Sequence, residues 1–244
     1  MKIGFLGFGE VGRALGQIEK EAGNEVLVRD LERDELAKVD ILHLCLPYNE
    51  GFLSSAISAI RTAEPSLIIN NATVPVGTTR KIGAECKIEI VHSPIRGMHP
   101  NMVPGIKTFP KLIGPTSPKS GELANKHFQE LGLTTVLCQD AETTEFAKLY
   151  DTLYYAWNIV FCKEIDKLCR EKGINFDQAY TLWNQTYNEG YNKLGKPNVA
   201  RPVLTPQPGQ IGGHCVIPNA KLAFEQFKDP LSKFVLDSNS TYSA

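Results

Sequence analysis

Apolar and polar positions along the first 140 residues predict strands and helices in alternation. Residues 2–7 form a short apolar run, residues 10–22 repeat apolar positions at helical spacing, and residues 25–30 form a second apolar run. These three segments predict a β-α-β unit. The alternation continues, with strands expected at 40–47, 66–72, 87–93, 111–115 and 134–138 and helices at 51–60 and 118–131. The fold class predicted is α/β with a doubly wound parallel sheet, because such sheets need helices on both faces.

One stretch interrupts this alternation. Between Arg96 and Pro110 the chain contains Gly97, Pro100, Pro104 and Gly105. Glycine and proline disfavour regular elements, so a long ordered loop is expected there.

The second part of the chain is predicted to be helical. From Ala141 to about Lys172 there is no proline or glycine, and apolar residues recur at helical spacing. One helix of ~45 Å is expected, which exceeds what a small sheet needs, so we expect a homodimer through residues 141–172. A further helix is predicted over 176–189, capped by Asn175. The chain then turns irregular after Gly190, and its polar last residues are expected to fray.

These patterns give three predicted segments. They are a nucleotide-binding domain at 1–140, a helical domain at 141–228 and a tail at 229–244. A net charge of −1 gives no reason to expect a nucleic acid or an anionic membrane as partner, and no apolar run is long enough for a membrane span or signal peptide. A cytoplasmic protein with a small-molecule substrate is expected. The six cysteines show no paired spacing, so no disulfide framework and no metal site is predicted.

A glycine-rich sequence follows the first predicted strand and opens the first helix. Asp30 ends the second strand, where its carboxylate can accept a hydrogen bond from a ribose hydroxyl. We therefore predict a Rossmann domain that binds NAD, although Arg29 and Arg33 leave NADP open. Pro47, after the third strand, is a further cofactor-binding candidate. The glycine-rich candidates are Gly7, Phe8, Gly9, Glu10, Val11 and Gly12.

Three other positions each allow two interpretations. Thr73 follows the strand at 66–72 at its ligand-binding end, and the threonines of that turn either face a ligand or cap a helix at 80–85. Cys215 follows two glycines and is either an accessible thiol or a buried residue of a turn. Lys148 lies among apolar neighbours on the long helix and is either desolvated or a solvated surface lysine.

Several segments, in their order, resemble the nucleotide-sugar 6-dehydrogenases, which include the UDP-glucose and GDP-mannose enzymes. The segments are TVPVGT at 73–78, the lysine-bearing helix at 142–174 and PGQIGGHC at 208–215. The resemblance implies two successive NAD-dependent oxidations of a sugar alcohol to an acid, with Cys215 forming a thiohemiacetal and then a thioester. It also implies that Lys148 stabilises developing negative charge and that Thr73 lies beside the cofactor.

The chain departs from that family's pattern at three positions. Ile95 stands where the family has a glutamate, Thr152 where it has an asparagine, and Asn219 where it has an aspartate. Thr152 and Asn219 remain candidate catalytic positions, but neither offers a carboxylate base. The family's C-terminal nucleotide-binding domain is also lacking, so we expect a short form.

Two alternatives therefore stay open. One is a two-electron hydroxyacid dehydrogenase or ketoacid reductase, which also joins a Rossmann domain to helices and uses a helix lysine. The other is a catalytically degenerate NAD-binding protein.

Overall fold

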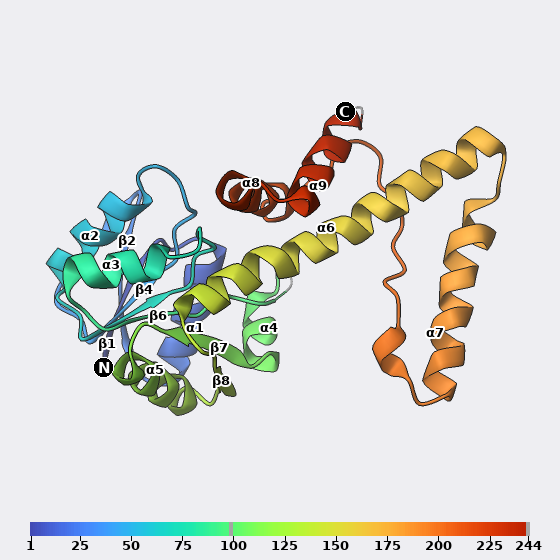
Figure 1. The fold of residues 1–244 in the computed structure, drawn as a ribbon. Helices are drawn as coiled ribbons and strands as arrows, with labels where there is room; N and C mark the ends of the chain where they lie inside the picture. Colours follow the sequence, from blue (N-terminus) through green and yellow to red (C-terminus); the bar gives the residue numbers. More distant parts are fainter. Residues whose placement is uncertain (98–99, 243–244) are drawn as a thin grey trace. The chain divides into compact units, whose positions relative to one another are not determined.

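The chain divides into two units in the computed structural model, which describes residues 1–97 and 100–242 (Figure 1). The first unit is Met1–Lys148 and the second is Leu149–Ala244. The boundary between them falls within one long helix. The segments predicted at 1–140, 141–228 and 229–244 remain a prediction.

The first unit is built on an eight-stranded sheet with the strand order β3-β2-β1-β4-β5-β6-β7-β8. All neighbouring pairs are parallel except β2–β3 and β6–β7. The strands are β1 Lys2–Leu6, β2 Glu25–Asp30, β3 Arg33–Asp34, β4 Ile41–Leu44, β5 Leu67–Asn70, β6 Ile90–His92, β7 Lys111–Pro115 and β8 Thr135–Leu137. The predicted fold class is confirmed, with two antiparallel pairings that the pattern did not indicate.

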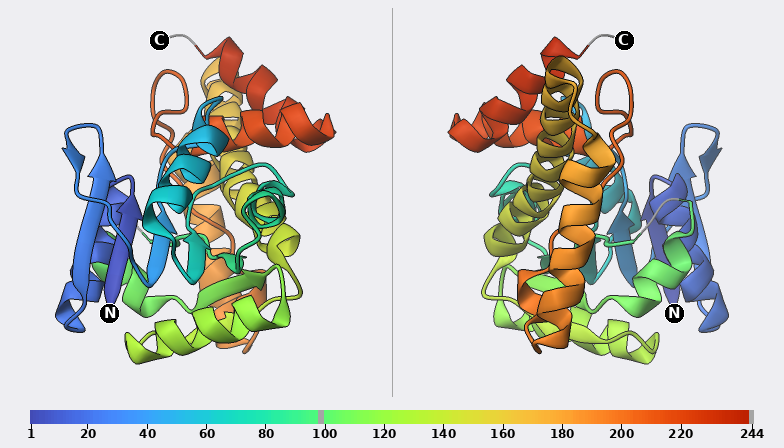
Figure 2. Two further views of the ribbon diagram at one scale, coloured as in Figure 1. Left: turned by 90° about the vertical axis from the view of Figure 1, so that its left-hand side faces the viewer. Right: turned by 90° about the vertical axis from the view of Figure 1, so that its right-hand side faces the viewer.

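Helices cover both faces of this sheet (Figures 1 and 2). On one face Ile3 and Phe5 of β1 belong to a core cluster with residues of α1, α4 and α5. On the other face Leu42 of β4 and Ile68 of β5 pack with α2 and α3. Successive strand residues thus point into opposite cores, which is why these strands are almost continuously apolar. The helices are α1 Glu10–Glu21, α2 Phe52–Ala63, α3 Thr78–Cys86, α4 Met102–Thr108 and α5 Pro118–Glu130.

Helix α4 corrects the prediction of a loop between Arg96 and Pro110. Pro104 lies in the first turn of α4, where a missing N–H costs no helical hydrogen bond. Met102 and Ile106, one turn apart, are both buried in the core cluster that contains α1. Tertiary packing therefore overrides the local preference of the glycine and prolines.

The second unit is helical. Its helices are the greater part of α6 Ala141–Lys172, the π-helix Asp177–Leu182, α7 Trp183–Lys193, the short 3₁₀ helix Pro197–Val199, α8 Val216–Phe227 and α9 Pro230–Thr241. The prediction of a single helix from Ala141 to Lys172 is confirmed. Asn175 accepts a hydrogen bond from the backbone N–H of Gln178, as expected of a cap.

Two features of the second unit differ from the sequence prediction. Helix α7 runs through Gly190 to Lys193 and does not end near residue 189. The end of the chain is helical through Thr241, where a frayed segment was expected. Asp229 caps α9, and Val235 of α9 is buried against α6 and α8, so tertiary contacts stabilise a locally polar sequence.

A buried polar cluster joins α1, β4 and α5 in the first unit. The Nε2 atom of His127 donates to Glu19 Oε1 at 2.7 Å, and His43 Nε2 lies 3.4 Å from the same oxygen. Burial alone would raise the pKa of Glu19, but the hydrogen bonds from the two histidines hold it at about 2. Burial also lowers the pKa of His43.

Glu19, His43 and His127 form a group whose ligand atoms lie close enough to one another to bind one metal ion. It is the group of this kind found among the residues that the structure describes. The Asn71 amide nitrogen lies 3.0 Å from His43 Nδ1 on the other side of the ring. The 2.7 Å hydrogen bond between His127 and Glu19 gives this buried carboxylate a partner within the protein.

Acid is expected to destabilise the first unit. Burial lowers the pKa of His92 from 6.5 to about 3, and His43 shifts in the same direction. The unfolded chain therefore binds more protons than the folded chain below pH 6.5, so stability falls as pH falls toward 3. The His92 contribution alone is about 2 kcal/mol between pH 7 and pH 5, at about 1.36 kcal/mol per pKa unit.

Urea unfolding at pH 7, 6 and 5 gives the free energy of unfolding at each pH, and hence the slope of stability against pH. His92→Gln should reduce the slope, whereas the same change at the exposed His214 should leave it unchanged. An identical slope in the wild type and His92→Gln would contradict the assignment.

Candidate functional site

The glycine-rich turn between β1 and α1 is shaped for close approach of a ligand to the backbone. Gly7 has a φ of +88°, a conformation that favours glycine. A Cβ on Gly12 would lie 2.3 Å from the Gly7 carbonyl oxygen, so only glycine fits there. No atom lies within 4 Å of the position that a Cβ on Gly9 would take. The N-terminal end of α1 is therefore open to an anion such as a pyrophosphate.

Asp30 ties this turn to the end of β2. Its Oδ2 accepts from the Phe8 N–H and its Oδ1 from the Leu31 N–H, both at 2.8 Å. A cavity of about 400 Å³ opens beside it, lined in part by Leu6, Leu46 and Ser58. The predicted ribose-binding carboxylate thus borders a cavity at the carboxyl edge of the sheet.

The two arginines that left NADP open are both paired with acids. Arg29 Nε contacts Asp34 at 2.8 Å, and Arg33 contacts Glu35 at 2.6 Å. These pairs neutralise the positive charge that a 2′-phosphate would need, which favours NAD. Of the other cofactor-binding candidates, Glu10 and Val11 are half-buried in the first turn of α1, and Pro47 is an exposed residue after β4. 

Thr73 is half-buried and follows β5 at the same edge of the sheet. The turn that follows is closed by the Thr78 N–H and Oγ1, which donate to the Pro75 carbonyl at 3.2 and 2.7 Å. Gly77, with a φ of +94°, occupies the turn position that requires a positive φ.

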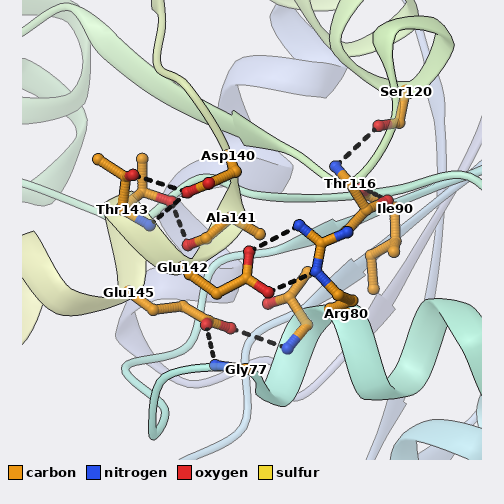
Figure 3. A network of polar contacts seen from close by, with 12 residues as sticks. Gly77, Arg80, Ile90, Thr116, Ser120, Asp140, Ala141, Glu142, Thr143 and Glu145 are labelled. Carbon is orange, nitrogen blue, oxygen red and sulfur yellow. Dashed lines mark hydrogen bonds and ion pairs between the residues drawn. The ribbon is translucent and has the colours of Figure 1, made fainter.

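The threonines of this turn do not cap α3, which corrects one of the two interpretations of the segment. The carboxylate of Glu145, near the start of α6, accepts from the Gly77 N–H at 2.6 Å and from the Thr79 N–H at 2.8 Å (Figure 3). Glu145 is fully buried, and burial raises its pKa. A residue more than sixty positions along the chain therefore supplies the cap.

Two further contacts fix the first turns of α6, one to helix α3 and one to strand β6. Arg80 of α3 forms a bidentate pair with Glu142, with Nη2 at 2.8 Å from Oε2 (Figure 3). His92 Nδ1 lies 2.8 Å from the Thr144 hydroxyl, and its Nε2 lies 3.0 Å from the Ala72 carbonyl oxygen next to Thr73. The start of α6 and the Thr73 turn are thus held in one hydrogen-bonded network.

Lys148 lies one turn beyond Thr144 and is half-buried. Its Nζ donates to the Ile95 carbonyl at 3.0 Å, so it is neither a fully solvated lysine nor a fully buried one. The Ile95 side chain itself is buried in the core, at the position where a glutamate was expected from the resemblance. At position 95, Lys148 therefore contacts a backbone carbonyl and not a carboxylate.

A second lysine, Lys111 of β7, contacts the same backbone segment. Its Nζ donates to the carbonyls of Ser93 at 3.1 Å and Pro94 at 3.3 Å, and it is only 3% exposed. Burial lowers its pKa to about 7. The sequence interpretation missed Lys111 and Glu145. A charged residue at the start of an apolar strand was an available signal for Lys111, but no local pattern marked Glu145.

Cys215, which belongs to the second unit, is exposed. The other five cysteines of the chain are buried or half-buried. Cys215 occupies the N-cap position of α8, and Gly213, with a φ of +85°, precedes it by two residues. The N-terminal end of a helix favours a negatively charged group. Cys215 is thus an exposed residue and not a buried one, while its role as a reactive thiol stays a prediction.

Thr152 and Asn219, the two positions of the second unit that depart from the family's pattern, contact each other. The Asn219 Nδ2 atom donates to the Thr152 hydroxyl oxygen at 3.1 Å. Asn219 is 5% exposed and lies in the first turn of α8, four residues after Cys215. The amide and the hydroxyl thus form a neutral pair beside the start of that helix.

Comparison with known proteins identifies relatives. The UDP-N-acetyl-D-mannosamine dehydrogenase of Methanocaldococcus jannaschii is 29% identical over an alignment of 196 residues, which covers 73% of this chain and 43% of that protein. The chain is thus similar in sequence to nucleotide-sugar dehydrogenases. A second such relative, the NDP-N-acetyl-D-galactosaminuronic acid dehydrogenase of Ralstonia solanacearum, is 25% identical and matches 83% of this chain and 51% of its own length. The chain spans about half the length of these nucleotide-sugar dehydrogenases or less.

Solved structures agree on the fold. The UDP-D-ManNAc dehydrogenase of Pyrococcus horikoshii gives a TM-score of 0.80 at 21% identity, over 98% of this chain and 68% of that one. The 3-hydroxyisobutyrate dehydrogenase of Mycobacterium tuberculosis gives 0.72 at 17% identity, over 97% and 91%. At these identities the likeness establishes the fold alone. No protein-family model matches the chain.

None of the helices within residues 1–97 and 100–242 combines the length and apolar character that a membrane-spanning segment requires.

Proposed function

We propose that this protein is an NAD-dependent oxidoreductase that oxidises the primary alcohol of a sugar nucleotide to the acid. The observation that carries the proposal is the exposed Cys215 at the start of α8. In a chain similar to nucleotide-sugar dehydrogenases, an exposed thiol that follows two glycines is suited to attack a carbonyl carbon.

The first unit supports NAD as cofactor. The turn at Gly7 and Gly12 would hold the pyrophosphate, and Asp30 would accept from a ribose hydroxyl. When bound, NAD would supply a hydride acceptor for each oxidation.

Cys215 would act on the aldehyde that the first oxidation produces. Its sulfur would form a C–S bond to the carbonyl carbon, giving a thiohemiacetal whose oxidation yields a thioester. Water would then cleave the C–S bond, releasing the acid and returning the free thiol. The neutral pair of Thr152 and Asn219 would orient that water without removing its proton, since neither side chain is a base at neutral pH.

Lys148 and Thr73 would serve the oxidation steps. Lys148 carries an amine fixed on the Ile95 carbonyl, from which it can donate to a developing alkoxide. Thr73 would contact the cofactor and an ordered water. The network that joins Glu145, His92 and the turn after β5 keeps both side chains on one rigid framework.

A homodimer formed through residues 141–172 is part of the proposal. Helix α6 exposes large apolar side chains, among them Tyr154 at 65% and Phe161 at 59%. An apolar groove of about 340 Å³ lies along the same helix, lined in part by Leu153, Trp157 and Leu231. Surfaces of this kind are typical of subunit interfaces.

A two-electron dehydrogenase of small hydroxyacids is a second candidate. The observation that favours it is the absence of a carboxylate at two positions, because Ile95 is packed in the core and Asn219 is an amide. An enzyme that never hydrolyses a thioester needs no base there.

The test is to count NADH at 340 nm with a panel of UDP-sugars, GDP-sugars and small hydroxyacids. Two NADH per nucleotide sugar consumed is the expected result. One NADH with a hydroxyacid would replace the proposal with the second candidate. NAD binding without turnover on any compound would indicate a degenerate NAD-binding protein.

A further inference from the structure

The loop that leads to Cys215 is attached to α6 through a lysine. Lys163 Nζ donates to the carbonyl of Gln207 in a short hydrogen bond and to the carbonyl of Gly209 at 2.7 Å. These carbonyls lie eight and six residues before Cys215. The sequence pattern gave no sign of this attachment, because Lys163 lies on a helix more than forty residues away.

The C-terminal end of the chain covers this lysine. The Tyr242 ring lies 4.5 Å from Lys163 Nζ, and the Tyr242 hydroxyl donates to Glu164 at 2.9 Å. Lys163 is only 9% exposed. An ammonium held by two carbonyls and a ring face, away from water, is a stronger contact than a surface lysine makes.

The loop itself contains little that would hold its shape. Gly209 and Gly213 both have positive φ values, and no atom lies within 4 Å of a Cβ built on Gly212 or Gly213. Glycines lose more conformational freedom on ordering than other residues do, so the loop depends on outside contacts. A second such contact is the Ile211 N–H, which donates to Asn239 of α9 at 2.6 Å.

The loop and α6 also enclose a cavity of about 440 Å³. Its lining includes Lys163, Gln207, Gln210, Gly212 and Val216, the residue after Cys215. The position of the loop therefore determines both the shape of this cavity and the start of α8.

We propose that Lys163 is a positioning residue for Cys215: by holding the carbonyls of Gln207 and Gly209, it fixes the loop that places the thiol at the N-terminal end of α8. The catalytic use of that thiol rests on the proposed function. The positioning itself does not, and it is measured without turnover.

The experiment compares Lys163→Met with wild type and with Lys167→Met, an exposed lysine one turn further along α6. Alkylation of Cys215 by iodoacetamide is followed by mass spectrometry of its peptide, and hydrogen exchange is followed over residues 207–213. In Lys163→Met, exchange should accelerate about tenfold or more, since opening of the loop no longer breaks two charged hydrogen bonds. Alkylation of Cys215 should change about two- to fivefold, because the loop no longer holds the thiol at the start of α8.

Lys163→Arg, which keeps charge and donors, should restore most of both rates. If Lys163→Met does not fold, Lys163→Gln retains an uncharged amide N–H donor group and should give intermediate rates. Unchanged alkylation and exchange in both Lys163→Met and Lys163→Gln would overturn the proposal, as would equal changes in Lys167→Met. If wild type turns over none of the substrates, the proposed function fails while the labelling result still decides the role of Lys163.

Discussion

Replacing Cys215 with alanine is expected to abolish acid formation, lowering the rate by on the order of 10³-fold or more. The thiol is the exposed one at the start of α8, and nothing else in the proposed chemistry forms the bond to the aldehyde carbon. The measurement is NADH release per nucleotide sugar, with acid and aldehyde separated by chromatography. The ratio should fall from two to one or below.

Two further variants make this result specific. Cys215→Ser keeps the size and a nucleophilic oxygen, but a hydroxyl is much less ionised than a thiol, so it should also fail to form acid. Cys86→Ala removes a half-buried thiol at the end of α3 and should keep full turnover. Acid production with two NADH per substrate in Cys215→Ala would exclude the covalent step.

Replacing Lys148 with methionine is expected to lower kcat by about 10²- to 10⁴-fold with little change in NAD affinity. Methionine retains much of the apolar packing of the lysine stem but has no amine to donate to a developing alkoxide. The Ile95 carbonyl also loses its donor, at a cost of about 1–3 kcal/mol in stability. Steady-state kinetics and NAD titration by fluorescence separate these effects.

The matched control is Lys81→Met, on the exposed side of α3 within the same unit. It removes the same charge from the domain, so a general electrostatic effect would appear in both variants. A kcat for Lys148→Met within about threefold of wild type would show that Lys148 acts only as a structural donor, because a lost charged contact in a transition state costs more than that.

The elements that sequence reasoning predicted well are those governed by neighbours along the chain. The β-α-β opening, the glycine turn with Asp30 and the helix from Ala141 to Lys172 follow from periodicity, turn chemistry and the absence of helix breakers. Helix α4 was missed because buried Met102 and Ile106 stabilise it more than Pro104 and Gly105 disfavour it. The same physics ordered α9 through Val235.

The sequence by itself indicated the type of domain, from the periodicity of its apolar positions, and the glycine-rich turn, from a few consecutive residues. Cys215 was predicted as the nucleophile from the family resemblance, since its neighbours alone left two interpretations open. Only the tertiary structure decided that Cys215 is exposed, that Glu145 caps α3, and that Lys111 and Lys148 bind consecutive carbonyls of one segment. Burial and hydrogen-bond partners are set by residues far apart in the chain. A local pattern contains no information about which of these distant groups will meet.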